Sequence, residues 1–432
     1  MTAEVAVMNR SAVALAADSA VTLSASSGVT KIFQNENKLF ELSRIHPVGV
    51  MLYNATTFFD VPWEIIIKDF RKERGDVACD HINSWADCFR DYVNRHDIFK
   101  PDEKRQKDFV EQIFTDQLNV ILAQWSIQSE HLFFEKQTKS VRSKYPELMK
   151  EVIASYNGWL ASLEFYVDMD DAIGSQILQT YSAEFASAKG KVFGHLPLDE
   201  THQNMLSELG RNVLVRSIPD WFTTGLVFSG FGQKELFPSL SCIELGGMVG
   251  NRLRWVQKRQ VDIDRADATA EIISFAQRET VDTLLFGRSS RYENSVITHF
   301  SEAMQQVGTS IVHQLTKPGL KRQDFEARLG AAVGGVMTHF RQQHAEELNK
   351  MFADDTLDIV RHMPKPDLAA FAESLVTVSS MKRKVTVGPE TVGGPVDVAI
   401  ISRHEGFIWV KRKLYFDPGL NQRYMSRTFG SK

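Results

Sequence analysis

The stretch that decides the fold is Thr2–Thr22, which reads TAEVAVMNRSAVALAADSAVT. It contains two short apolar runs, Val5–Val7 and Val13–Ala17, on either side of a polar turn. Apolar runs with little polar alternation are typical of strands that are buried on both faces. The second run ends at Asp18, and a carboxylate in such a place is costly to bury without a cationic or hydrogen-bonded partner. The sequence therefore predicts a buried β-hairpin with a partnered acid at its end.

Two further strands are predicted downstream of this hairpin, at Lys38–Leu42 and Pro47–Tyr53. Lys38 opens the first of them. Its ammonium group is a plausible partner for Asp18, because an opposite charge compensates a buried carboxylate.

Beyond these strands the pattern becomes mainly helical before strand character returns. Asp60 can cap a helix whose first turn holds Pro62 and which ends before Gly75. Helical periodicity then dominates residues 80–215 and again residues 291–352. Later strands are predicted at Gly225–Phe231, Ser239–Leu245, Thr283–Phe286, Val396–Ser402 and Phe407–Lys413. Strands near both ends of the chain, with helices between them, favour an α+β fold whose sheets are assembled from distant segments.

The composition is that of an ordinary globular protein. The chain has 432 residues, of which 43% are hydrophobic and 24% charged, and its formal net charge is -4. This charge gives no electrostatic reason to expect nucleic acid or an anionic membrane as a partner. Three irregularly spaced cysteines, Cys79, Cys88 and Cys242, favour a reduced, cytoplasmic location over a disulfide framework. No apolar run reaches the length of a membrane span, and no metal-ligand spacing or cofactor motif is found, so neither a metal nor a cofactor is expected.

The first residues have a chemistry of their own. Loss of Met1, which is normally trimmed before threonine, would leave Thr2 with a free α-amine beside its hydroxyl. A nucleophile that carries its own base has this arrangement. An α-amine has an ordinary pKa of about 7.7–8.0, so a useful fraction of it is neutral near pH 7. Thr2 is therefore predicted to be a catalytic nucleophile.

Thr2, Asp18 and the segments around them resemble the proteasome β-subunit family, including its bacterial peptidase relatives. The family pattern is a strand from a nucleophilic threonine, a turn, and a strand that ends in Asp-Ser-x-x-Thr, which Asp18–Thr22 matches. Thr2 and Asp18 are 16 positions apart, as in the family. The family's catalytic lysine corresponds to Lys38. Because the gap between Asp18 and Lys38 is a few residues longer than usual, Lys31 is a second candidate.

Other parts of the chain extend the resemblance. Glu390–Val398 resembles the family's Asp-x-x-Ser-Gly-Gly loop and the strand after it, with Glu390 one position out of register and Thr391 roughly where the family has serine. Ser274–Gln277 resembles the family's Ser-x-Gly-Ser-Gly turn, with Gln277 in place of a serine. The resemblance implies a four-layer αββα N-terminal-nucleophile (Ntn) hydrolase sandwich of two antiparallel sheets. The sandwich would be built from residues 1–75, 220–290 and 365–416, with helical insertions at 80–215 and 291–352.

The resemblance also implies roles for individual residues. The catalytic group would comprise Thr2, Asp18, Lys38, Glu390, Thr391 and Gln277. Backbone N–H groups near Tyr53 and Asn54 would form the oxyanion hole, where the family has a glycine and this chain has none. Peptide substrates would add as a strand along Thr22 and Gly49, with Met51 shaping the first specificity pocket.

The expected activity is that of a threonine peptidase, which hydrolyses amide bonds through an ester on Thr2. One alternative is an Ntn amidase or acylase that acts on a small amide, and another is a non-catalytic proteasome-like assembly subunit. The resemblance further implies a peptide or protein substrate, assembly into a homo-oligomer and, as a possibility, an unfoldase partner.

Overall fold

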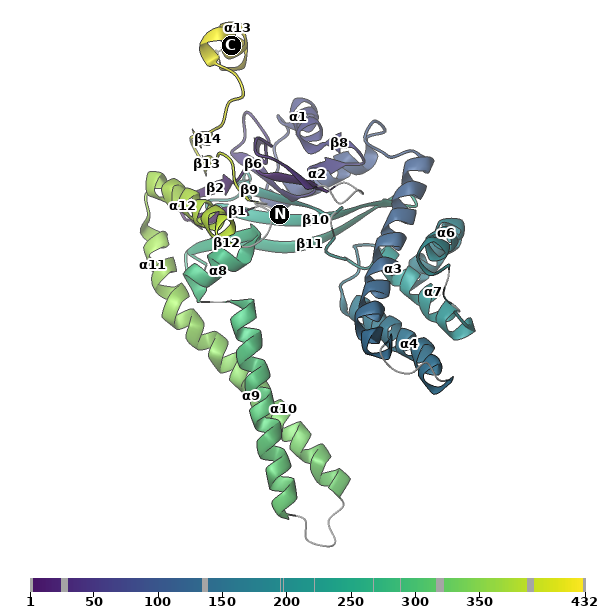
Figure 1. Ribbon diagram of the computed structural model, residues 1–432. Coiled ribbons are helices and arrows are strands. Elements are labelled where there is room, and N and C mark those ends of the chain that lie inside the picture. The colour runs from purple at the N-terminus through teal and green to yellow at the C-terminus, as the bar shows by residue number, and fades with distance from the viewer. Residues whose placement is uncertain are drawn as a thin grey trace.

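A computed structural model gives the fold of residues 3–24, 30–133, 139–194, 196, 198–220, 222–266, 268–287, 289–315, 322–386 and 392–429. Two antiparallel five-stranded sheets form the centre of the molecule (Figure 1). The prediction of an α+β fold with two antiparallel sheets is confirmed.

The first sheet contains the N-terminal hairpin and has the strand order β12-β1-β2-β13-β14. The middle of this sheet is formed by β2, which pairs with β1 on one side and with the distant β13 on the other. The bounds of its strands are β1 Ala3–Asn9, β2 Ala12–Ala17, β12 Ala270–Ala276, β13 Asp397–Ser402 and β14 Gly406–Lys411. Both β1 and β2 are buried along their whole length, as their unbroken apolar runs predict.

The second sheet has the order β11-β10-β9-β6-β5. Its strands are β5 Leu39–Glu41, β6 Val48–Asn54, β9 Thr224–Gly230, β10 Ser239–Val249 and β11 Arg252–Asp262. Two short ribbons complete the β structure, namely β3 Val21–Ser24 with β4 Thr30–Phe33 and β7 Thr57–Phe58 with β8 Val61–Pro62. A buried apolar cluster that includes Leu15 and Ile401 of the first sheet and Met51 and Val227 of the second joins the two sheets.

Helices pack against each sheet. The helices α8 Arg278–Phe286, α11 Asp354–His362 and α12 Lys365–Lys384 contact strands of the first sheet. The helices α1 Trp63–Arg74 and α2 Ile82–Arg95 share a buried cluster with strands of the second. Because α12 covers β1, β2 and β13, these strands have an apolar environment on both faces.

Two further groups of helices extend from this centre (Figure 1). One has its own buried cluster and contains α3 Glu103–Phe133, α4 Lys139–Ser162, α5 Asp171–Thr180, α6 Ser182–Phe193 and α7 Glu200–Val215. The other is a long projecting hairpin of α9 Ser290–Leu315 and α10 Arg322–Leu348, which leads through a π-helical turn, η1 Asn349–Ala353, into α11. The chain ends in η2 Pro418–Asn421 and α13 Gln422–Phe429, which lie away from the body in Figure 1.

Two local predictions are wrong. Thr283–Phe286 belongs to the helix α8 and not to a strand. Val281 and Leu285, four positions apart, are buried while Leu284 is exposed, which is helical periodicity, and Gly287 ends the helix at φ 62°. Asp60 does not cap α1, because Pro62 is the N-cap residue and makes no side-chain capping bond.

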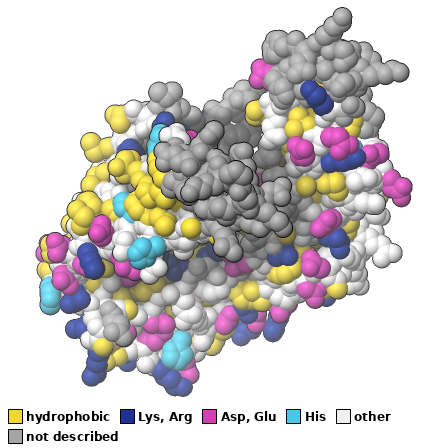
Figure 2. Space-filling model, turned by 90° about the horizontal axis from the view of Figure 1, so that it is seen from below, with side chains coloured by type: hydrophobic (Ala, Val, Ile, Leu, Met, Phe, Trp, Pro, Cys, Tyr) yellow, Lys and Arg dark blue, Asp and Glu magenta, His cyan; other side chains and the backbone are white. Residues whose placement is uncertain are grey.

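On the face shown in Figure 2, acidic and basic side chains are interspersed and neither sign forms a continuous patch. None of the helices among the described residues has the length and apolar content needed to cross a membrane.

Candidate functional site

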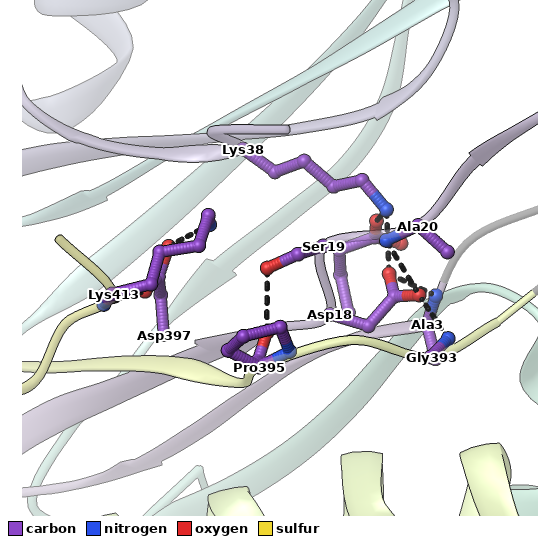
Figure 3. Close-up of polar contacts among 10 residues, drawn as sticks. Ala3, Asp18, Ser19, Ala20, Lys38, Gly393, Pro395, Asp397 and Lys413 are labelled. Carbon is purple, nitrogen blue, oxygen red and sulfur yellow. Dashed lines mark hydrogen bonds and ion pairs between the residues drawn. The ribbon is translucent and has the colours of Figure 1, made fainter. Parts of the chain in front are cut away.

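Asp18 and Lys38 form a buried ion pair (Figure 3). Lys38 Nζ lies 2.5 Å from Asp18 Oδ1, and the two side chains are 1% and 0% exposed. Lys31 is exposed, and its ammonium group lies 5.0 Å from the ring centroid of Phe33. Of the two lysines that the sequence offered, the structure therefore brings Lys38 to Asp18.

The pair joins the two sheets. Asp18 follows the last residue of β2, in the first sheet, where Ala17 is paired with Glu4 of β1. Lys38 immediately precedes β5, in the second sheet, and its carbonyl accepts a hydrogen bond from Leu52 N of β6 at 2.8 Å. Both backbones are held by ladder contacts, so the two charged groups meet at a fixed place.

Backbone N–H groups complete the environment of the Asp18 carboxylate. Ala3 N donates to Oδ1 at 3.1 Å, and Ala20 N and Gly393 N donate to Oδ2 at 3.3 and 2.9 Å. A carboxylate that accepts several such bonds and an ammonium is well compensated although it is buried. Ala3 is the residue next to Thr2, so Asp18 fixes the chain beside the predicted nucleophile.

The loop before β13 docks on this site through glycine. Ser19 N donates to Gly393 O at 3.1 Å, and Ser19 Oγ donates to Pro395 O at 2.5 Å. Gly394 has φ 77°, and a Cβ there would lie 2.5 Å from Gln34 O. The contact between Ser19 and the Gly393-Gly394 loop therefore depends on glycine at 394, because only glycine fits this backbone and this space.

Two buried acids were absent from the sequence prediction. Glu4 Oε1 lies 3.5 Å from Lys38 Nζ, so this ammonium faces two carboxylates. Asp397 at the start of β13 forms an ion pair with Lys413 Nζ and accepts a bond from Lys413 N at 2.8 Å. The signal for both was the same as for Asp18, since each is a carboxylate in or next to an apolar strand.

Gln277 lies at the junction between β12 and α8, where it is the residue before the helix. The preceding residue, Ala276, pairs with Ala3 in the first sheet and has φ 56°. A left-handed backbone at a residue other than glycine costs free energy, and such strained residues cluster at functional sites. The structure thus places Gln277 directly after Ala276, the residue that pairs with Ala3 at the start of β1.

The residues Thr2, Glu390 and Thr391 lie outside the described residues. Their predicted catalytic roles stay predictions.

Tyr53 and Asn54 end β6 and have different surroundings. The Tyr53 side chain is buried, and its hydroxyl donates to Glu244 Oε1 at 2.9 Å. Burial, together with the neighbouring Cys242 and Glu244, raises the pKa of Tyr53 well above its ordinary value, so this phenol stays neutral. Asn54 is exposed and has φ 65°. Among the described residues, no polar side-chain contact joins either residue to Asp18 or Lys38.

Gly49 and Met51 are both buried residues of β6. A Cβ at Gly49 would lie 2.8 Å from both the Ile401 and Phe407 side chains of the first sheet, so the glycine allows the two sheets to approach here. Met51 is 0% exposed and belongs to the cluster between the sheets. Both residues are therefore buried where the two sheets meet, and their predicted roles in substrate binding stay predictions.

Thr22 and Asn54 do lie together, on a cleft of about 600 Å³. The cleft also receives residues of the 54–60 segment and of α3. Thr22 is part of β3, which begins three residues after Asp18, and Asn54 lies two residues after Leu52, which donates to the Lys38 carbonyl. Thr22, predicted to bind substrate, and Asn54, predicted to flank the oxyanion hole, thus line the same cleft.

Within the described part of the chain, no group of three or more His, Cys, Asp or Glu side chains is arranged to hold a metal ion. Comparison with models of known protein families found no match, and no curated protein matched the chain either.

Proposed function

We propose that this protein is a threonine peptidase of the proteasome type, with Thr2 as its nucleophile. One observation carries the proposal: the backbone N–H of Ala3 is bonded to Asp18, which is paired with Lys38 in a buried site. A buried ammonium beside the residue that follows Thr2 is what an N-terminal nucleophile requires, because positive charge assists both its hydroxyl and its amine.

The arrangement of the elements supports the finer fold assignment. Two antiparallel sheets share an apolar cluster, α8, α11 and α12 contact one of them, and α1 and α2 pack with the other. We take this as a four-layer αββα sandwich of the Ntn-hydrolase type. The helices α3–α7 and the α9–α10 hairpin are its proposed insertions.

In the proposed mechanism, the bond before Thr2 is first cleaved, which frees the α-amine. The Thr2 hydroxyl then attacks the scissile carbonyl and passes its proton to that amine. The amine returns the proton to the leaving nitrogen as the C–N bond breaks, and an ester to Thr2 remains. Water hydrolyses the ester and restores the hydroxyl. Lys38, fixed by Asp18, supplies positive charge, and backbone N–H groups at Tyr53 and Asn54 are the proposed oxyanion donors.

Intact mass spectrometry of the purified protein is the first test, and the proposal expects loss of Met1. A peptidyl epoxyketone should then label Thr2, since this group reacts with both the hydroxyl and the free amine. Thr2→Ala should abolish peptide hydrolysis and labelling, whereas Thr2→Ser should keep part of the activity. Retained Met1 together with an unlabelled, inactive protein would favour the non-catalytic assembly role.

Hydrolysis by the Thr2→Ala protein would refute the nucleophile. Turnover of small acyl amides without cleavage of peptides would favour the amidase alternative. Assembly into a homo-oligomer is a separate part of the proposal, and light scattering during size exclusion tests it, with a strict monomer as the contrary result.

A further inference from the structure

The cleft that contains Thr22 and Asn54 is walled on one side by α3, a helix of the first proposed insertion. Phe109 of α3 lies edge-on to Phe59, with ring centroids 4.9 Å apart, and to Phe222 at 5.4 Å. All three rings line the cleft. Its wall is therefore an aromatic surface that combines an insertion helix with residues near the ends of β6 and β9.

The buried guanidinium of Arg254 packs against two of these rings. Arg254 is 0% exposed, and its guanidinium lies 5.6 Å from the ring centroid of Phe109 and 5.3 Å from that of Phe222. The guanidinium also donates to Gly246 O at 2.7 Å. Gly247 has φ 82°, and a Cβ there would lie 2.4 Å from the Phe109 ring. The Phe109 ring thus fills the space that a side chain at 247 would take. Gly247 and the Arg254 guanidinium therefore both restrict where this ring can lie.

The segment between Asn54 and Asp60, which also lines the cleft, has a strained backbone. Asn54, Phe59 and Asp60 have φ of 65°, 46° and 67°, and all three line the cleft. Asn and Asp tolerate the left-handed region, but a bulky residue such as Phe59 adopts it only when its surroundings enforce it. Such strain is concentrated at ligand sites, and here three such residues line one cleft.

Val21 and Thr22 of β3 line the cleft as well. The Thr22 Oγ1 atom is buried and has no hydrogen-bond partner among the described residues. In the sheets that these residues form, β3 is paired with β4 alone, so no strand of the described residues pairs with its other edge. An extended peptide along an open edge gains main-chain hydrogen bonds and places alternate side chains in neighbouring pockets.

We infer that this cleft binds an apolar, preferably aromatic, side chain of an extended peptide substrate, and that Phe109 of the insertion helix sets its specificity. The inference rests on the proposed peptidase function and names the substrate class. A cleft of about 600 Å³ is within the usual range for ligand sites, about 300–1,000 Å³. An aromatic side chain gains contact with the fixed rings, while an acidic or short side chain does not.

The test compares kcat/KM for peptides that differ only in the residue before the cleaved bond, namely Phe, Leu, Ala or Glu. The wild-type protein should prefer Phe over Ala by at least about tenfold, because even one methylene in an apolar pocket changes kcat/KM by about 10–200-fold. Phe109→Ala should reduce this ratio at least about tenfold. Phe109→Trp, which keeps the aromatic packing, should shift the preference from Phe towards Ala.

The matched control is Trp125→Ala, an aromatic residue of the same helix that packs against Tyr145 and is not part of the cleft. It should leave the Phe to Ala ratio unchanged. An unchanged ratio in an active Phe109→Ala or Phe109→Trp protein would overturn the inference and leave the peptidase proposal intact.

A second measurement separates the two proposals. Calorimetry with the Thr2→Ala protein measures the binding of an N-acetylated Phe-containing peptide without turnover. The inference expects this peptide to bind more tightly than its Ala counterpart, and Phe109→Ala to remove the difference. If the wild-type protein binds the Phe-containing peptide selectively but neither hydrolyses peptides nor reacts with the epoxyketone, the cleft inference stands and the peptidase proposal is refuted. Equal binding of the two peptides would refute the cleft assignment.

Discussion

Gly393 donates its backbone N–H to Asp18 Oδ2 at 2.9 Å, although 375 positions separate the two residues in the chain. The same carboxylate also fixes Ala3 at the start of β1. The site therefore depends on a loop near the C-terminal end of the chain, and substitutions in that loop should act on the chemistry at the other end.

Gly394→Ala should impair both stability and peptide hydrolysis. The residue has φ 77°, and a Cβ would meet Gln34 O at 2.5 Å, so the loop must move and take the Gly393 N–H away from Asp18. We expect a loss of about 2–4 kcal/mol in the free energy of unfolding, because backbone strain and a steric clash add together. Denaturant unfolding and kcat/KM measure the two effects.

Gly406→Ala is the matched control. Gly406 has φ 75° but no neighbouring atom within 4 Å of an added Cβ. It should lose only about 1–2 kcal/mol, the cost of a left-handed residue, and should keep its activity. Equal losses of activity in Gly394→Ala and Gly406→Ala would show that the Gly-Gly loop does not act on the site through its bond to Asp18.

Asp18→Asn and Lys38→Met should each destabilise the protein by about 3–5 kcal/mol, because each leaves a buried charge without its main partner. The double variant removes both charges and should lose less than the sum of the single losses, with a coupling energy of about 1–3 kcal/mol. Urea unfolding of the four proteins gives this cycle. Strict additivity would mean that the 2.5 Å contact carries no net interaction.

Lys31→Met tests the choice between the two lysines. Lys31 is exposed, with its ammonium over Phe33, so its removal should change the free energy of unfolding by less than about 0.5 kcal/mol. Peptide hydrolysis should persist in Lys31→Met and be lost in Lys38→Met. The reverse pattern would transfer the catalytic role to Lys31.

Tyr53→Phe should keep peptide hydrolysis and lose about 1–3 kcal/mol of stability, because a buried hydroxyl bonded to Glu244 is removed while the backbone N–H stays. The variant thus distinguishes an oxyanion donor in the Tyr53 backbone N–H from a catalytic role of the Tyr53 hydroxyl. A drop of two orders of magnitude in kcat with unchanged stability would assign catalysis to the phenol.

Local sequence patterns predict the N-terminal strands of this fold and the ion pair at their end. The apolar runs of β1 and β2 predicted buried strands, and the carboxylate at their end predicted the partner that Lys38 supplies. Glu4 carried the same signal and was overlooked. The segment Thr283–Phe286 lies in a helix where the sequence predicts a strand, because its short apolar run, Leu284–Phe286, does not separate strand from helix.

The cleft could not be predicted, because it depends on tertiary contacts. Phe109 looks like any apolar residue of an amphipathic helix, and its contacts with Phe59 and Phe222 join segments about 50 and over 100 residues away. Positive φ at Phe59 has no sequence signal either, since phenylalanine does not favour the left-handed region.

Asp199 provides a test of pH dependence far from the site. It caps α7, where it accepts a bond from His202 N at 3.0 Å and faces the His202 ring and Lys150. The backbone bond from His202, followed by the side chains of His202 and Lys150, lowers the pKa of Asp199 below its ordinary value of 3.8. A lowered pKa in the folded state means that this carboxylate adds stability above the pKa of the unfolded chain, and that the gain is lost as the pH falls towards the folded value.

Asp199→Asn keeps a capping side chain and removes the charge. The variant should therefore unfold at a lower temperature than the wild-type protein at pH 7, and the difference should shrink as the pH falls below about 4, where the unfolded carboxyl is protonated. Glu200→Gln, one residue along the same helix, is the control for loss of one acidic group from the first turn. Thermal unfolding at several pH values measures both variants. A difference for Asp199→Asn that stays constant from pH 7 to the acid limit would show that the ionised carboxylate does not stabilise the cap of α7.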